Sequence, residues 1–130
     1  MPQHQIRFWL PGEPVAQARA RTGKGHGYYP AKSAGYRKWA ALSLRSQHMG
    51  EPPLAGPIKL GLLFYRVRPK SNKTGWPVVR PDLDNYVKML CDALMDAGIL
   101  ADDSQICSLD AGKFWTTDKP GVEVVLEPLT

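Results

Sequence analysis

Cysteine and histidine are scarce in this sequence, and their spacing does not suit a structural metal site. Cys91 and Cys107 are the only cysteines, and neither belongs to a CxxC pair or stands at zinc-ligand spacing from a histidine. His4, His26 and His48 are scattered along the chain. We therefore expect no structural zinc, and we expect Cys91, on the apolar side of a predicted helix, to be a buried free thiol.

Long apolar runs are also missing. No segment approaches the ~20 apolar residues that a membrane-spanning helix needs. The N-terminal stretch MPQHQIRFWLPGEP has no basic leader followed by a long apolar core. We therefore expect a cytoplasmic protein without a membrane partner. The length of 130 residues, with 43% hydrophobic and 22% charged residues, predicts one globular domain over residues 1–130.

Acidic residues are nearly absent from the first part of the chain. Residues 1–81 contain 14 Lys and Arg but only Glu13 and Glu51, a net charge of +12, whereas residues 82–130 carry a net charge of −7. This asymmetry favours a nucleic-acid partner, although a fold that mixes both parts into one neutral surface is the alternative. We expect two segments to grip a phosphate backbone: a first loop with Arg19, Arg21 and Lys24, and the loop 68–80 with Arg68, Lys70, Lys73 and Arg80. Trp76 of the second loop either stacks on exposed DNA bases or anchors the loop on the domain.

Hydrophobic periodicity predicts an α+β fold, a mixed sheet with two helices on one face in the order β(β)αβαββ. A strand is expected at 6–10, and a loop or irregular hairpin follows it. The next helix starts near Lys32 with Ser33 as N-cap and an apolar side that includes Tyr36, Trp39, Ala40 and Leu42. A strand over 58–67 turns Ile58, Leu60, Leu62 and Phe64 to one face. Two final strands lie within 105–115 and 121–129, and the turn TTDKPG between them suits a hairpin.

Six aspartates are crowded into residues 80–106. Asp82 and Asp84 flank Leu83, and in an extended segment their side chains share one face, with Cα atoms ~6.6 Å apart. Two converging carboxylates suit Mg²⁺, which takes one or two carboxylates plus water and substrate phosphate. Helix capping by Asp84 or Asn85 is the alternative, and it explains one carboxylate of the pair but not both.

A helix follows this pair, with an apolar stripe of Val87, Leu90, Cys91, Leu94 and Ala97 and with Gly98 at its C-terminal end. Lys88 lies four residues after Asp84, so it forms either an ordinary ion pair or a cationic contact to a metal-bound phosphate. Asp92 and Asp96 continue along the same side, and we interpret them as a solvated polar face. Beyond the helix come Asp102 and Asp103, whose spacing from the first pair permits a third metal ligand without requiring one.

The stretch RPDLDNYVK…DALMDAGILADDSQI resembles the signature of the RusA family of Holliday junction resolvases, D-x-D-N-x-x-K followed by D-A-L and D-D-x-x-I. The segments LPGEPVAQARAR and YYPAKSAGYRKW are similar to N-terminal segments of the same family. Lys113 matches a basic position after the D-D pair and is expected to contact DNA. The resemblance covers nearly the whole chain. It implies metal-binding carboxylates at Asp82, Asp84 and Asp103, with Lys88 as an essential lysine at the phosphate.

The resemblance also selects between the neighbours Asp102 and Asp103. Adjacent residues of an extended segment point to opposite faces, so only one of the two is expected to face the first pair. The family signature selects Asp103 and leaves Asp102, like Asn85, to support the site from behind the metal ligands.

These observations predict a Mg²⁺- or Mn²⁺-dependent endodeoxyribonuclease that cuts four-way DNA junctions. We expect it to work as a homodimer, because resolution needs two symmetric nicks, and we expect no small-molecule cofactor. One alternative is a DNA-binding module without catalysis, in which the acids are caps and surface residues. Another is a different metal-dependent nuclease or phosphohydrolase without a preference for junctions.

Overall fold

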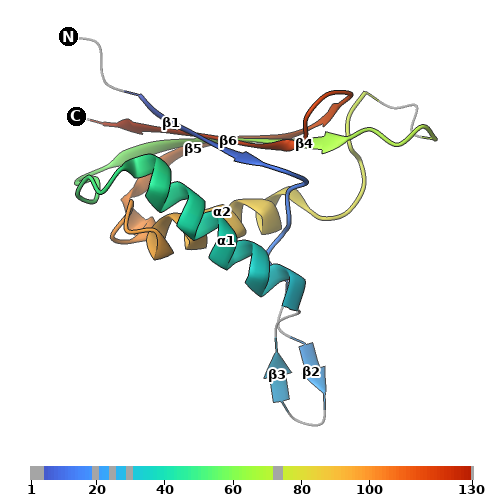
Figure 1. Ribbon diagram of the computed structural model, residues 1–130, viewed down its shortest axis with the longest axis horizontal. Coiled ribbons are helices and arrows are strands. Elements are labelled where there is room, and N and C mark those ends of the chain that lie inside the picture. The colour runs from blue at the N-terminus through green and yellow to red at the C-terminus, as the bar shows by residue number, and fades with distance from the viewer. Residues whose placement is uncertain (1–4, 19–20, 24–25, 29–30, 72–74, 130) are drawn as a thin grey trace.

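The computed structural model describes residues 5–18, 21–23, 26–28, 31–71 and 75–129. Its centre is a four-stranded sheet of β1 (Ile6–Pro11), β4 (Ile58–Val67), β5 (Ile106–Thr116) and β6 (Gly121–Pro128), in the order β1-β6-β4-β5. Two helices, α1 (Ala31–His48) and α2 (Leu83–Asp96), cover one face of this sheet (Figure 1). A separate hairpin of β2 (Arg21–Gly23) and β3 (His26–Tyr28) extends from the N-terminal end of α1. The predicted α+β class, with two helices on one face of a mixed sheet, is confirmed.

The last two strands do not form the hairpin that the sequence suggested. β4 lies between them, parallel to β5 and antiparallel to β6, and β1 pairs with the outer side of β6. The turn chemistry between β5 and β6 reverses the chain direction but does not select the neighbouring strand. β4 and β6 are the two inner strands, and β4 has the fully buried side chains Ile58, Leu60, Leu62 and Phe64. The alternation predicted for β4 is confirmed.

The core lies between this sheet and the two helices. Phe8 and Leu10 of β1, and Val122, Val124 and Leu126 of β6, face the helices together with the buried side of β4. α2 contributes most on the helix side, and its Tyr86 ring stacks on Phe64 with ring centroids 5.0 Å apart. The predicted apolar stripe of α2 is confirmed, and Gly98 takes the left-handed conformation (φ 77°) that ends a helix.

Two expectations for α1 are wrong. Ser33 is not the N-cap, because the helix begins at Ala31 and the buried Ser33 hydroxyl accepts a hydrogen bond from the Ala18 N–H at 3.1 Å. Trp39 and Leu42 lie on the exposed side of α1, at 40% and 59% exposure. The buried side consists of Ser33, Ala40, Leu44 and His48. The buried side therefore combines the polar Ser33 and His48 with Ala40 and Leu44, where a stripe with Trp39 and Leu42 was expected. In the part of the chain that the structure describes, neither helix is long and apolar enough to cross a bilayer.

Candidate active site

Two cationic side chains hold the segment that leads into α2. Lys113 of β5 donates hydrogen bonds from its Nζ to the backbone carbonyls of Val79 (2.8 Å) and Pro81 (3.0 Å). Arg66 of β4 donates from its Nη1 to the carbonyl of Arg80 at 3.0 Å. Three carbonyls directly before Asp82 are thus tied to the ends of two adjacent parallel strands. The backbone at Asp82 is therefore positioned by the sheet and by the start of α2 together.

Asp82 is the N-cap residue of α2, with an extended backbone (φ −69°, ψ 149°), and its side chain makes no capping hydrogen bond. The expectation that Asp84 or Asn85 caps the helix is wrong. Asp84 already lies in the first helical turn, so the two carboxylates are not alternate residues of one extended segment. Both side chains are exposed. Because capping does not occupy Asp82, its carboxylate remains available for another partner.

Lys88 lies one turn further along α2. It forms an ion pair with Asp92, not with Asp84 as one of the two alternatives predicted. Its Nζ donates to Oδ1 of Asp92 at 3.1 Å, and the lysine side chain is 58% exposed. The pKa of Lys88 is raised, first by this hydrogen bond and by the Asp92 charge, and further by the charge of Asp103. Asp103, distant in sequence, is therefore close enough in space to act electrostatically on Lys88.

The segment around Asp103 is a single 3-10 turn (Asp103–Gln105), not an extended strand. Asp102 precedes it as N-cap and accepts a hydrogen bond from the Ser104 hydroxyl at 2.7 Å, which lowers the pKa of Asp102. The Gln105 side chain accepts the N–H groups of Ala101 and Asp102 and donates to the carbonyl of Leu54. The argument from alternating strand faces therefore does not apply, because β5 begins only at Ile106.

A metal requires ligands with the right chemistry in the right place. Asp82, Asp84 and Asp103 supply exposed carboxylate oxygens, the ligand type that Mg²⁺ prefers, and among the described residues none of the three forms an ion pair. The same part of the chain contains no group of three or more His, Cys, Asp or Glu side chains gathered as a ready metal cage. The donor set fits an ion that takes one or two carboxylates and completes its shell with water and substrate oxygens.

Two hollows meet at Asp82. One, of about 700 Å³, is lined by Asp82 and Asn85 and by the cations Lys32, Arg66 and Arg80. The other, of about 430 Å³, lies between Asp82, Lys113 and residues 76–80. The carboxylate thus lies at the border of a cationic cavity. Asn85 also takes part in the backbone framework, because its carbonyl accepts the Gln17 N–H at 3.0 Å.

The structure places some of the residues that were expected to contact DNA and leaves others outside its description. Arg68, Lys70 and Arg80 are exposed in the connection between β4 and α2. Arg21 lies in β2, and its side chain is not described; Arg19, Lys24 and Lys73 lie outside the described residues. Lys113 uses its ammonium on the two backbone carbonyls named above.

Trp76 belongs to a row of aromatic rings on the sheet face opposite the helices. Its ring centroid lies 5.5 Å from that of Phe114, which is 5.6 Å from Tyr65, and Tyr65 is 6.3 Å from Trp9. Trp76 is nevertheless 62% exposed. The ring therefore contacts Phe114 and leaves a large part of its surface in solvent.

Asp92 is the residue that the sequence interpretation misplaced. It was expected on a solvated face, yet it is buried and lies between two cations, Lys88 at 3.1 Å and Arg37 of α1 at 3.7 Å. Asp96, which is exposed, binds the same Arg37 through two hydrogen bonds of 2.6 and 3.0 Å. The four-residue spacing of Lys88 and Asp92 could have predicted their ion pair from the sequence. The contact between Asp92 and Arg37 could not be predicted, because it depends on how α1 and α2 pack together.

Comparison with known proteins places this arrangement among enzymes that cut DNA. The family described as Endodeoxyribonuclease RusA matches residues 11–127. A Bacillus subtilis (strain 168) protein named "Uncharacterized protein YqaN" is 38% identical over 96% of this chain and 97% of its own length. The "Crossover junction endodeoxyribonuclease rusA" of Lactococcus phage r1t is 41% identical over 44% of each chain.

The class is therefore that of the endodeoxyribonucleases. Within it, the chain belongs to the RusA family, as the residues of the D-x-D-N-x-x-K and D-D-x-x-I segments indicated.

Proposed function

We propose that the protein is a metal-dependent endonuclease that resolves four-way DNA junctions. The family match over residues 11–127 supports the nuclease activity, and the printed name of the phage relative supports the crossover junction as substrate. One structural observation carries the assignment of the site. Asp82, Asp84 and Lys88 occupy the start of one helix, and Asp103 lies within electrostatic reach of Lys88.

Asp82, Asp84 and Asp103 are the residues that would hold Mg²⁺ or Mn²⁺. When bound, such an ion activates water and neutralises charge on the attacking and leaving oxygens of the phosphodiester. The protein contributes the position of the carboxylates: Lys113 and Arg66 fix the backbone before Asp82, and the Gln105 contacts fix the turn that carries Asp103. Phosphodiester hydrolysis through these residues needs no organic cofactor.

Lys88 supplies positive charge near the phosphate. Its ammonium is exposed and, like that of any lysine, protonated at neutral pH; the hydrogen bond to Asp92 stabilises the charged form further and raises the Lys88 pKa. A fixed cation lowers the barrier where negative charge develops in the transition state. The +12 charge of residues 1–81 provides contacts to the DNA backbone that do not depend on sequence.

Junction resolution requires two nicks placed symmetrically, so we propose that two copies of the chain act together as a C2 dimer. Light scattering tests this directly. A particle of twice 14.4 kDa, alone or on the junction, supports the dimer, and a 14.4 kDa monomer in both conditions contradicts it.

The function itself is tested with a four-way junction and a duplex of matched sequence, each with Mg²⁺ and with EDTA. Cleavage of the junction alone, and only with metal, is the expected result. Equal cleavage of both substrates would favour a nuclease without junction preference. Binding without any metal-dependent cleavage would favour a DNA-binding module.

A further inference from the structure

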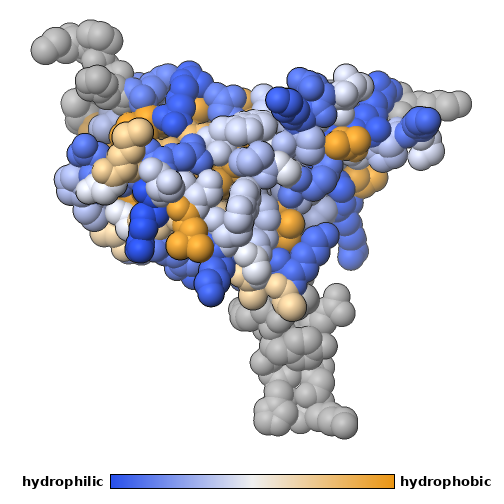
Figure 2. Space-filling model, in the orientation of Figure 1, coloured by the Kyte–Doolittle hydropathy of each residue, from blue (hydrophilic) through white to orange (hydrophobic). Residues whose placement is uncertain are grey.

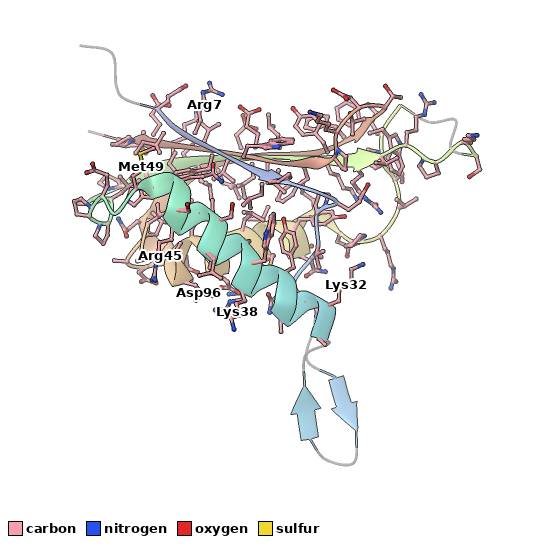
Figure 3. All side chains as sticks on the ribbon, viewed as in Figure 1. Arg7, Lys32, Lys38, Arg45, Met49 and Asp96 are labelled. Carbon is pink, nitrogen blue, oxygen red and sulfur yellow. The ribbon has the colours of Figure 1, made fainter. Side chains whose placement is uncertain are left out.

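One side of α1 carries a basic stripe that the proposed active site does not use. The helix has 18 residues and includes Lys32, Arg37, Lys38 and Arg45 but no acidic residue. Arg37, Lys38 and Arg45 recur at the three- to four-residue spacing that places side chains on one side of a helix, together with Ala34 and Ala41. Figure 3 shows Lys38 and Arg45 along the lower edge of α1, with Asp96 of α2 between them.

This stripe forms one wall of a groove between the two helices. The groove has a volume of about 610 Å³, and its other wall consists of Lys88, Asp92 and Asp96, which succeed one another at four-residue spacing on α2. Small side chains of α1, Ala34 and Ala41, keep it open. Seen from the α1 side, the surface is mainly hydrophilic and its hydrophobic residues are scattered (Figure 2). Charged side chains line both walls of the groove, and the small or apolar side chains of Ala34, Ala41 and Leu42 lie among them.

The charges in the groove are not equally available. Asp92 and Asp96, the two carboxylates of the α2 wall, contact Arg37 and Lys88 at 2.6 to 3.7 Å, and the Arg37 contacts with Asp96 lower the pKa of that carboxyl. Lys38 and Arg45 form no ion pair within the described part of the chain. The acids of the groove are thus compensated by two cations, and two further cations remain for a ligand.

The spacing of these two cations matches a strand of DNA. Lys38 and Arg45 are seven residues apart, which is ~10 Å along a helix. Successive phosphates of one strand are separated by about 3.4 Å along the duplex axis and by more along the backbone itself, so two cations ~10 Å apart contact different phosphates of one strand. Lys88 lies in the opposite wall of the same groove. A backbone that follows the groove therefore reaches the lysine of the proposed active site.

We propose that the groove between α1 and α2 binds the phosphodiester backbone of a DNA arm, through Lys38 and Arg45, next to the site of cleavage. The proposal rests on the proposed function, since DNA is the ligand in both. It adds a binding surface that is separate from the loop 68–80 and from the first basic loop. Neither Lys38 nor Arg45 is buried, so both can be replaced without removing a core contact.

The test compares two variants that lose the same charge. Lys38→Gln/Arg45→Gln removes two cations from the groove. Lys59→Gln/Lys119→Gln removes two exposed cations elsewhere, from the sheet face opposite the helices and from the turn before β6. Binding to a four-way junction is measured in EDTA at several salt concentrations, so that no cleavage interferes. A thermal melt of each variant checks that it is folded.

The slope of log K against log salt is the decisive quantity, because each lost phosphate contact lowers its magnitude by about one unit. We expect the groove variant to bind more weakly and to lose about two units of slope, and the control variant to stay near the wild type. Equal behaviour of the two variants would overturn the groove assignment, even if the wild type cleaves junctions.

Two further results show whether the groove proposal can hold when the proposed nuclease activity fails. If the groove variant loses binding while the wild type shows no metal-dependent cleavage, the groove is a DNA site and the proposed nuclease activity is wrong. If the wild-type protein does not bind DNA at all, both proposals are contradicted.

Discussion

The Lys88 ammonium and the Asp92 carboxylate lie 3.1 Å apart on successive turns of α2, and they differ sharply in environment. Asp92 is 6% exposed, whereas the Lys88 side chain is 58% exposed. A buried carboxylate at the base of an exposed lysine restrains its position and favours its charged form. Asp92 thus connects Lys88 to Arg37, and through Arg37 to α1.

This relationship predicts that Asp92→Asn lowers cleavage through Lys88. The variant keeps the shape of the side chain but removes its charge, so Lys88 is held less firmly. We expect turnover to fall while junction binding is retained. In a double-mutant cycle, Asp92→Asn is expected to have little further effect once Lys88 is already Ala. Fully additive effects of the two changes on turnover would contradict the connection.

Asp96→Asn is the matched control for that experiment. It weakens the contact with Arg37, as Asp92→Asn also does, but Asp96 does not contact Lys88. We expect a stability loss of at most ~1 kcal/mol for this exposed pair and near-normal turnover. Loss of turnover in Asp96→Asn as large as in Asp92→Asn would show that the tie between the helices, not the position of Lys88, is what matters.

Lys88 itself is expected to be essential for turnover and dispensable for folding. Lys88→Ala removes an exposed cation and with it the hydrogen-bond partner of the buried Asp92, so we expect a stability loss of about 1–3 kcal/mol from a fold that still forms, while cleavage should fall by orders of magnitude. Lys88→Arg tests geometry, because guanidinium and ammonium groups differ in shape and hydration. Steady-state cleavage and thermal melts of both variants measure this. Wild-type turnover in both would remove Lys88 from the mechanism.

Asp102 is expected to support the site without binding the metal. Its carboxylate accepts the Ser104 hydroxyl in the turn that carries Asp103. We expect Asp102→Asn to keep metal-dependent cleavage, reduced ~10–100-fold if it orients a ligand. Cleavage rates at several Mg²⁺ concentrations measure the effect. Complete loss of activity in Asp102→Asn, with activity kept in Asp103→Asn, would reverse the assignment of the two residues.

The two cysteines provide a test of the fold that does not depend on activity. Burial, followed by the nearby charges of Asp103 and Asp92, raises the pKa of the Cys91 thiol to about 11, whereas Cys107 is exposed on β5. At pH 8 a thiol-reactive reagent should label Cys107 quickly and Cys91 only after unfolding. Mass spectrometry of native and denatured protein shows this. Equal labelling of both in the native protein would contradict the packing of α2.

The sequence was sufficient where local pattern and burial agree. β4 alternates apolar and other residues and is one of the two inner strands, and the stripe of α2 faces the core up to Gly98. The sequence was insufficient where packing between distant segments determines strand order or the burial of a side chain. Insertion of β4 between β5 and β6 depends on pairing between strands distant in sequence, and burial of Asp92 depends on packing against α1, which supplies Arg37. The family signature assigned Asp103 to the site, which spacing alone did not require, and this assignment stays a prediction.

The central claim is that Asp82, Asp84 and Asp103 hold the metal at the phosphate to be cut. The most direct measurement is cleavage and binding of a four-way junction by Asp82→Asn, Asp84→Asn and Asp103→Asn, each in Mg²⁺ and in EDTA. The account predicts that each variant loses cleavage but binds the junction as well as the wild type or better, because loss of a negative charge favours DNA. Near-normal Mg²⁺-dependent cleavage by any one of the three would contradict its place in the site.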